Sequence, residues 1–172
     1  MDMATLAPVS LAEYLNTDYE PDCDYVDGVL QERNVGKRRH SRTQALLSAR
    51  LIYEEKNHRC EVVVEQRVQV SPSRVRIPDI CLIPAEAREE TTQTPPLLCI
   101  EILSPEDRWS RVQDRLTDYL KFGVRTVWII DPYSNEAWIA TPEAAARPVE
   151  DGKLRCAQLN LEIPLADILP AD

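Results

Sequence analysis

LLCIEILS, residues 97–104, is a nearly continuous apolar run that holds one charged residue, Glu101. Such a run is typical of a central strand covered on both faces of its sheet. The upstream segment RVRIPDICLIP (74–84) follows a Ser-Pro-Ser turn and holds Asp79 between apolar residues. Because a charge in a buried strand is costly unless it is paired or binds a metal, Asp79 and Glu101 are candidate functional residues.

If these two segments form neighbouring strands, their carboxylates can meet on one face of the sheet. Converging carboxylates provide hard oxygen ligands that suit Mg²⁺, with Mn²⁺ as a substitute. Such an ion would polarise a phosphodiester and lower the pKa of an attacking water. The purely structural alternative is that Asp79, which follows a proline, ends a strand, and that Glu101 lies on an exposed edge.

Downstream of this stretch, the pattern predicts a helix over 109–122 that ends at Gly123, because its apolar residues recur at helical spacing. An apolar strand follows at 125–131, and NEAWIAT (135–141) is expected to pair with it. The remaining residues predict a strand near 153–159 and a terminal LEIPLADIL segment.

Upstream, CEVVVEQRVQV (60–70) predicts a strand, and residues 40–57 predict a helix. In that helix Ala45, Ala49, Ile52 and Tyr53 recur at three- and four-residue steps, with Leu47 and Leu51 as a second apolar row. Asp27-Gly28 predicts a hairpin turn, and a short helix is expected over 10–17 with Ser10 as its N-cap. Together these elements predict an α/β (α+β) fold with a mixed central sheet flanked by helices.

Length and composition indicate one domain over residues 1–172, since 44% apolar residues in a chain of this size suffice for one core. No apolar run is long enough to span a membrane, and the start MDMATLAPVS lacks the pattern of a signal peptide. The five cysteines contain no C-x-x-C pair, which favours free thiols in a reducing cytoplasm.

The net charge of −9 argues against a protein that coats nucleic acid without specificity. Residues 1–31 hold seven acidic side chains and no basic ones, whereas residues 33–50 hold six basic side chains and no acidic ones. The basic block either contacts phosphates or forms a solvated loop and helix start, and the sequence favours neither.

A site for phosphate chemistry also needs a positive group that neutralises developing charge. Leu103, two residues after Glu101, cannot supply it. Arg115 borders the apolar stripe of the helix at 109–122 and is a candidate that points toward the sheet. The alternatives are that Arg115 extends to solvent along the helix flank or pairs with Asp118.

PDI (78–80), PLLCIEILSPED (96–107), DRLTDYLKFGV (114–124) and VWIIDP (127–132) resemble, in order and spacing, the Uma-type bacterial family of “putative restriction endonucleases”. DYVDG (24–28) and GKRRH (36–40) also match its pattern, so that the resemblance covers residues 10–170. It implies the PD-(D/E)XK nuclease core, also called the restriction-endonuclease-like fold.

The resemblance also implies roles for individual residues. Asp79 and Glu101 would bind the divalent metal, and the backbone carbonyl of Ile102 would add a ligand. Asp24 stands where the family usually has a Glu of the acidic site, and His40 matches a His before the long helix. Leu103 replaces the Lys expected after the Glu, and Arg115 stands where this family carries its Lys on the following helix.

The resulting hypothesis is a Mg²⁺-dependent DNA endonuclease in which Arg115 stabilises the phosphate and the basic block at 33–42 holds the DNA backbone. The alternative is a catalytically weakened module that binds DNA or a protein without cleavage, which Leu103, Arg115 and the negative charge favour. A homodimer is also expected, with sheet-edge pairing through 135–141 as one route.

Overall fold

The computed structural model describes residues 8–170. Residues 1–7, which contain most of the segment considered for a signal peptide, lie outside this range. Within the described residues a six-stranded sheet has the order β10-β9-β8-β7-β6-β3, in which β7 and β8 are parallel and the other pairs are antiparallel. Its strands are β3 (Cys60–Val64), β6 (Ile80–Pro84), β7 (Leu98–Ile102), β8 (Val127–Asp131), β9 (Glu136–Thr141) and β10 (Ala144–Pro148). The expected mixed central sheet is therefore confirmed.

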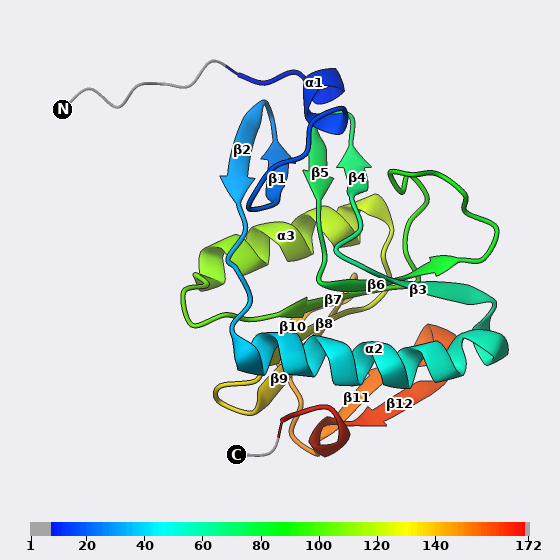
Figure 1. Cartoon of the computed structure of the whole chain (residues 1–172). Coiled ribbons are helices and arrows are strands. Elements are labelled where there is room, and N and C mark those ends of the chain that lie inside the picture. Colours follow the sequence, from blue (N-terminus) through cyan, green and yellow to red (C-terminus); the bar gives the residue numbers. More distant parts are fainter. Residues whose placement is uncertain (1–7, 171–172) are drawn as a thin grey trace.

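Two long helices cover opposite faces of this sheet, as Figure 1 shows. Leu98, Ile100 and Ile102 of β7 pack with Leu47 and Leu51 of α2 (Arg38–His58). The alternate residues of β7 face α3 (Trp109–Phe122), where Cys99 packs with Val112, Leu116 and Tyr119. Because successive strand residues point to opposite faces, Glu101 is directed toward α3. The central, doubly covered position expected for residues 97–104 is confirmed.

A four-stranded sheet, β2-β1-β5-β4, lies on the far side of α3, beside the short helix α1 (Leu11–Leu15) (Figure 1). Its strands are β1 (Cys23–Val26), β2 (Val29–Glu32), β4 (Val68–Ser71) and β5 (Arg74–Arg76). Asp27 and Gly28 have φ of 51° and 89° and form the expected two-residue hairpin turn between β1 and β2. Ser10 accepts a hydrogen bond from the Glu13 amide and caps α1, also as expected.

The two strands predicted at 60–70 and 74–84 are each divided between the sheets. β3 ends before Glu65, whose φ of 52° turns the chain out of the six-stranded sheet and toward β4. On the return, β5 ends at Arg76, and Pro78, which has no amide hydrogen to donate to a ladder, separates it from β6. The prediction of two continuous strands was wrong, and the division leaves Asp79 at the start of β6.

The predicted core face of the long helix was also wrong in part. The buried residues of α2 are His40, Thr43, Leu47 and Leu51, which form one row at helical spacing. The row that begins with Ala45 faces solvent, and the side chains of Ile52 and Tyr53 are 52% and 76% exposed. The helix therefore presents its second apolar row to the sheet.

Two corrections concern the C-terminal part of the chain. β9 pairs with β8 on one side and with β10 on the other, so residues 135–141 offer no free edge for dimer formation. The strand expected near 153–159 is β11 (Lys153–Cys156), which pairs with β12 (Leu161–Pro164). Short 3₁₀ turns, Ala157–Leu159 and Leu165–Asp167, follow these strands.

None of the helices found in residues 8–170 combines the length and the apolarity that crossing a membrane requires.

Candidate functional site

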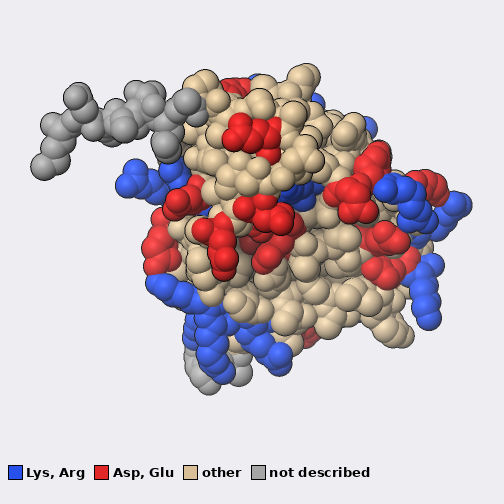
Figure 2. Space-filling model, turned by 45° about the horizontal axis from the view of Figure 1, so that its top comes forward, with Lys and Arg blue, Asp and Glu red and all other residues tan. Residues whose placement is uncertain are grey.

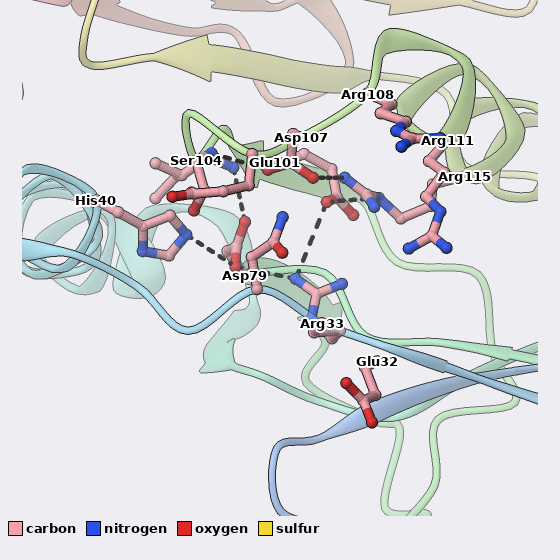
Figure 3. A pocket seen from close by; sticks show the side chains of 13 residues that line it. Glu32, Arg33, His40, Asp79, Glu101, Ser104, Asp107, Arg108, Arg111 and Arg115 are labelled. Atoms are coloured by element: carbon pink, nitrogen blue, oxygen red, sulfur yellow. Dashed lines mark hydrogen bonds and ion pairs between the residues drawn. The ribbon is translucent and has the colours of Figure 1, made fainter.

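Asp79 and Glu101 meet at one end of the β6–β7 pair. The antiparallel register places Ile80 opposite Ile100, and the Ile102 amide donates a hydrogen bond of 2.7 Å to Asp79 Oδ2. Both carboxylates are buried, yet both line a pocket of about 230 Å³ (Figure 3). The structure thus brings together the two residues that the sequence singled out first.

Glu101 is held by two side chains of α3. The Tyr119 hydroxyl donates a hydrogen bond of 2.7 Å to Glu101 Oε1, and Arg115 Nε lies 2.9 Å from Glu101 Oε2. Arg115 Nη2 lies 3.6 Å from Asp107 Oδ1 in the loop after β7. Arg115 therefore points toward the sheet, as one alternative expected, whereas Asp118 pairs with Arg74 and Arg76 instead.

Arg33, which the sequence placed only within the basic block, lies buried among the carboxylates. Its Nη2 is 3.0 Å from Asp79 Oδ1 and 4.0 Å from Glu101 Oε2, and its Nη1 is 3.5 Å from Asp24 Oδ1. The one feature of the sequence that could have placed Arg33 at the site is its position directly after β2, where the chain leaves the hairpin. Nothing in the local pattern distinguishes Arg33 from the solvated arginines that follow it.

His40 lies in the first turn of α2, and its Nε2 is 3.3 Å from Asp79 Oδ1. The absence of a side chain at Gly36 leaves room for this imidazole, because a Cβ there would lie 2.7 Å from His40 Nδ1. Buried polar atoms at this site, among them His40 Nδ1 and Arg33 Nη1, lack hydrogen-bond partners among the described residues. Such atoms are costly unless a ligand or water satisfies them, which is typical of a functional site.

The two carboxyl groups respond differently to burial. Burial alone would raise the pKa of Asp79, but Arg33, His40 and the Ile102 amide together hold it below its ordinary value. Burial raises the pKa of Glu101 above its ordinary value despite the opposing effect of Arg115 and Arg33. For His40, burial opposes the charged form, but its hydrogen bond to Asp79 leaves the pKa raised.

Asp24 lies next to this site without lining the pocket. Its Oδ1 accepts a hydrogen bond of 3.1 Å from the Ile77 amide, and its Oδ2 accepts one of 3.0 Å from Arg76 Nη1. Its link to the pocket is therefore the contact with Arg33.

The carboxylate oxygens at the pocket are ligands that suit a divalent cation. Asp79 and Glu101 supply hard carboxylate oxygens on one wall, and the Arg33 guanidinium near both marks a place where positive charge is favourable. Within residues 8–170, no three His, Cys, Asp or Glu side chains form a group with metal-site geometry. The two carboxylates thus fit a divalent ion in their chemistry, and its further ligands would have to come from backbone, water or substrate.

The basic block does not form one continuous surface. Lys37 pairs with Glu106, Arg39 Nη1 donates to the Pro132 carbonyl at 2.9 Å, and the Arg33 side chain is only 15% exposed. Figure 2 shows acidic side chains over the middle of one face and basic ones toward its edges.

The comparisons with known proteins agree with the fold. The Uma2 family model, described as “Putative restriction endonuclease”, matches residues 11–167. Five chains of solved structures match, and no curated protein does. One is the crystal structure of “a putative nuclease belonging to DUF820” from Anabaena variabilis, with 21% identity over 94% of this chain and 98% of that chain, and a TM-score of 0.84. At that identity the likeness shows the fold, while the family model covers nearly the whole chain. This protein therefore belongs to the Uma2 family, whose restriction-endonuclease-like members generally use a divalent metal.

Proposed function

We propose that this protein is a Mg²⁺-dependent endonuclease that hydrolyses phosphodiester bonds of DNA. The observation that carries the proposal is the convergence of Asp79 and Glu101, both buried, on the wall of one solvent-accessible pocket. A buried pair of carboxylates at that position lowers stability unless a ligand or a counter-charge neutralises it. Membership of a nuclease family makes a phosphodiester the substrate that this pocket fits best.

Asp79, Glu101 and the Ile102 carbonyl would hold the ion, and Mn²⁺ would substitute for Mg²⁺. When bound, the ion would polarise the phosphodiester and lower the pKa of the attacking water. Arg115, already in contact with Glu101, would stabilise charge on the phosphate; its guanidinium keeps its proton and so cannot act as a base. Asp24 would act through Arg33, by orienting that guanidinium at 3.5 Å.

The proposal extends to the setting in which the protein works. Residues 1–172 would act as one domain in the cytoplasm, where the five cysteines, all buried and free, would stay reduced. A homodimer remains part of the proposal, and the exposed Ile52 and Tyr53 of α2 are the apolar side chains that it would cover. Sedimentation of the purified protein would measure its mass in solution.

A second candidate function has its own supporting observation. The Arg33 guanidinium already neutralises Asp79, and Leu103 packs into the core beside α3 where a lysine would complete the site. Both features favour a nuclease fold that binds DNA or a protein partner with little or no cleavage.

Cleavage of supercoiled plasmid with Mg²⁺ or Mn²⁺ separates the two functions. Wild type should nick the plasmid only with metal. Asp79→Ala and Glu101→Ala should abolish nicking but remain folded, as a cooperative unfolding transition of each variant would show. Retained cleavage in both variants would refute the proposed site. No nicking by wild type, together with metal-induced stabilisation, would favour the weakened module, because a ligand that binds only the folded state raises its stability.

A further inference from the structure

α3 presents a row of arginines that leads from the mouth of the pocket to its carboxylates. Arg111 and Arg115 are four residues apart and lie on one side of the helix, and Arg108 is the N-cap residue directly before its first turn. All three line the pocket, and Figure 3 shows them at the same side of the site, opposite Glu32 of β2. The innermost, Arg115, is committed to Glu101 and Asp107.

The two outer arginines have no counter-charge of their own. Both side chains are exposed, and within the described residues neither takes part in an ion pair or a side-chain hydrogen bond. By contrast, the acidic residues nearest to them in the loop have partners: Glu106 pairs with Lys37, and Asp107 accepts a hydrogen bond from the Ser104 amide at 2.8 Å. Two unpaired guanidinium groups at the mouth of a pocket are suited to bind an anion.

The opposite side of the site carries negative charge. A second pocket, of about 280 Å³, shares Arg33, His40 and Asp79 with the first and is lined farther out by Glu20, Asp22 and Glu65. A polyanion leaving the carboxylates in that direction would meet like charges, whereas toward Arg108 and Arg111 it would meet opposite ones. The charges at the two ends of the site therefore favour one path for a polyanionic chain, from the carboxylates toward Arg108 and Arg111.

We propose that Arg108 and Arg111 form a phosphate-binding subsite that holds a backbone phosphate next to the one at Asp79 and Glu101, so that a nucleic acid strand crosses the N-terminal end of α3. This inference rests on the proposed function for the identity of the polyanion. It moves the phosphate contacts from the basic block at 33–42 to α3. Arg38 and Arg42, the exposed arginines of that block, line neither pocket.

The test measures binding of fluorescein-labelled DNA and RNA oligonucleotides by anisotropy in EDTA, where no cleavage occurs. Arg108→Gln/Arg111→Gln should weaken binding about tenfold or more, and the slope of log affinity against log salt should fall by about one for each phosphate that the variant no longer binds. Arg125→Gln is the matched control, because Arg125 is exposed, has no ion pair with any described residue and precedes β8 at the opposite end of the sheet. The DNA and RNA arms identify which strand supplies the phosphates.

The subsite would be overturned by no oligonucleotide binding by wild type, by an affinity of the double variant within twofold of wild type, or by an equal loss of affinity in Arg125→Gln. If only Arg38→Gln/Arg42→Gln lowers the oligonucleotide affinity, the basic block binds the phosphates, and this result would also overturn the proposed subsite. Plasmid nicking by wild type is scored separately. Binding that depends on Arg108 and Arg111, without nicking, would support the subsite and contradict the proposed hydrolysis. Nicking by wild type, with binding that does not depend on these arginines, would support the hydrolysis and contradict the subsite.

Discussion

Two clusters of carboxylates and guanidinium groups lie side by side in this molecule, and they differ in how many of their polar atoms have partners. The bridging cluster consists of Asp24, Arg74, Arg76 and Asp118, and it joins the four-stranded sheet to α3. The pocket cluster consists of Arg33, His40, Asp79, Glu101 and Arg115.

In the bridging cluster the Arg76 guanidinium uses all of its nitrogens. Nε and Nη2 contact Asp118 at 2.7 Å, and Nη1 contacts Asp24 at 3.0 Å and Gln31 at 3.3 Å. In the pocket cluster, Arg33 Nη1 and His40 Nδ1 lack hydrogen-bond partners among the described residues, and the carboxylates line open space. The two clusters have similar composition. The closed one holds secondary-structure elements together, whereas the open one has polar atoms available for a ligand.

The largest effect should come from breaking the closed cluster. Arg76→Met leaves Asp24 and Asp118 buried with fewer partners, and removal of one partner from a buried ion pair costs about 3–5 kcal/mol. Urea unfolding should show a loss of that size. Arg125→Met, an exposed control, should stay within about 0.5 kcal/mol of wild type. A loss below about 1 kcal/mol in Arg76→Met would contradict the structural role.

Asn substitutions at Asp79 and Asp24 test which of the two clusters binds Mn²⁺. With Mn²⁺ at about 100 times its Kd, wild type should gain about 2.7 kcal/mol of unfolding free energy, measured as a rise in Tm. Asp79→Asn should lose this gain. Asp24→Asn should keep it while losing stability without metal, because the Ile77 amide and Arg76 lose a charged acceptor. Equal Mn²⁺ gains in both variants would place the metal elsewhere.

Replacing Arg33 tests whether its guanidinium competes with the metal. Arg33→Met removes the positive charge 3.0 Å from Asp79, so Mn²⁺ measured by titration calorimetry should bind about tenfold more tightly, or about 1.4 kcal/mol. Arg125→Met is the control for a change of net charge alone, since Arg125 is exposed and does not line the pocket. Weaker Mn²⁺ binding in Arg33→Met would show that Arg33 assists the ion.

The smallest effect concerns pH. Because burial raises the pKa of Glu101 in the folded state above its ordinary 4.5, the folded protein binds this proton more tightly than the unfolded chain does. The stability of wild type relative to Glu101→Gln should therefore fall as pH rises from 4.5 through the raised pKa, and then level off. Urea unfolding of both proteins between about pH 4 and about pH 8 measures the difference, and the opposite slope would contradict it.

The local sequence determined much of this protein. The apolar run around Glu101 predicted a strand covered on both faces, Asp27-Gly28 predicted the hairpin, and Gly123 predicted the end of α3. These features depend on neighbouring residues alone: side-chain alternation, turn geometry and the left-handed φ of 117° at Gly123. The same local pattern identified Asp79 and Glu101, because a charge in an apolar run is visible without knowledge of the fold.

Tertiary structure decided which charges meet. The division of residues 60–84 between two sheets depends on pairing partners far along the chain, so no local pattern separated β3 from β4 or β5 from β6. Ile52 and Tyr53 were as apolar as the buried row of α2, and only the position of the sheet left them exposed. Arg33 comes within reach of Asp79, 46 residues away, because the fold places the chain after β2 beside the start of β6. Sequence sets what each short segment prefers, whereas contacts between distant segments fix the partners of each charge and the opening of the pocket.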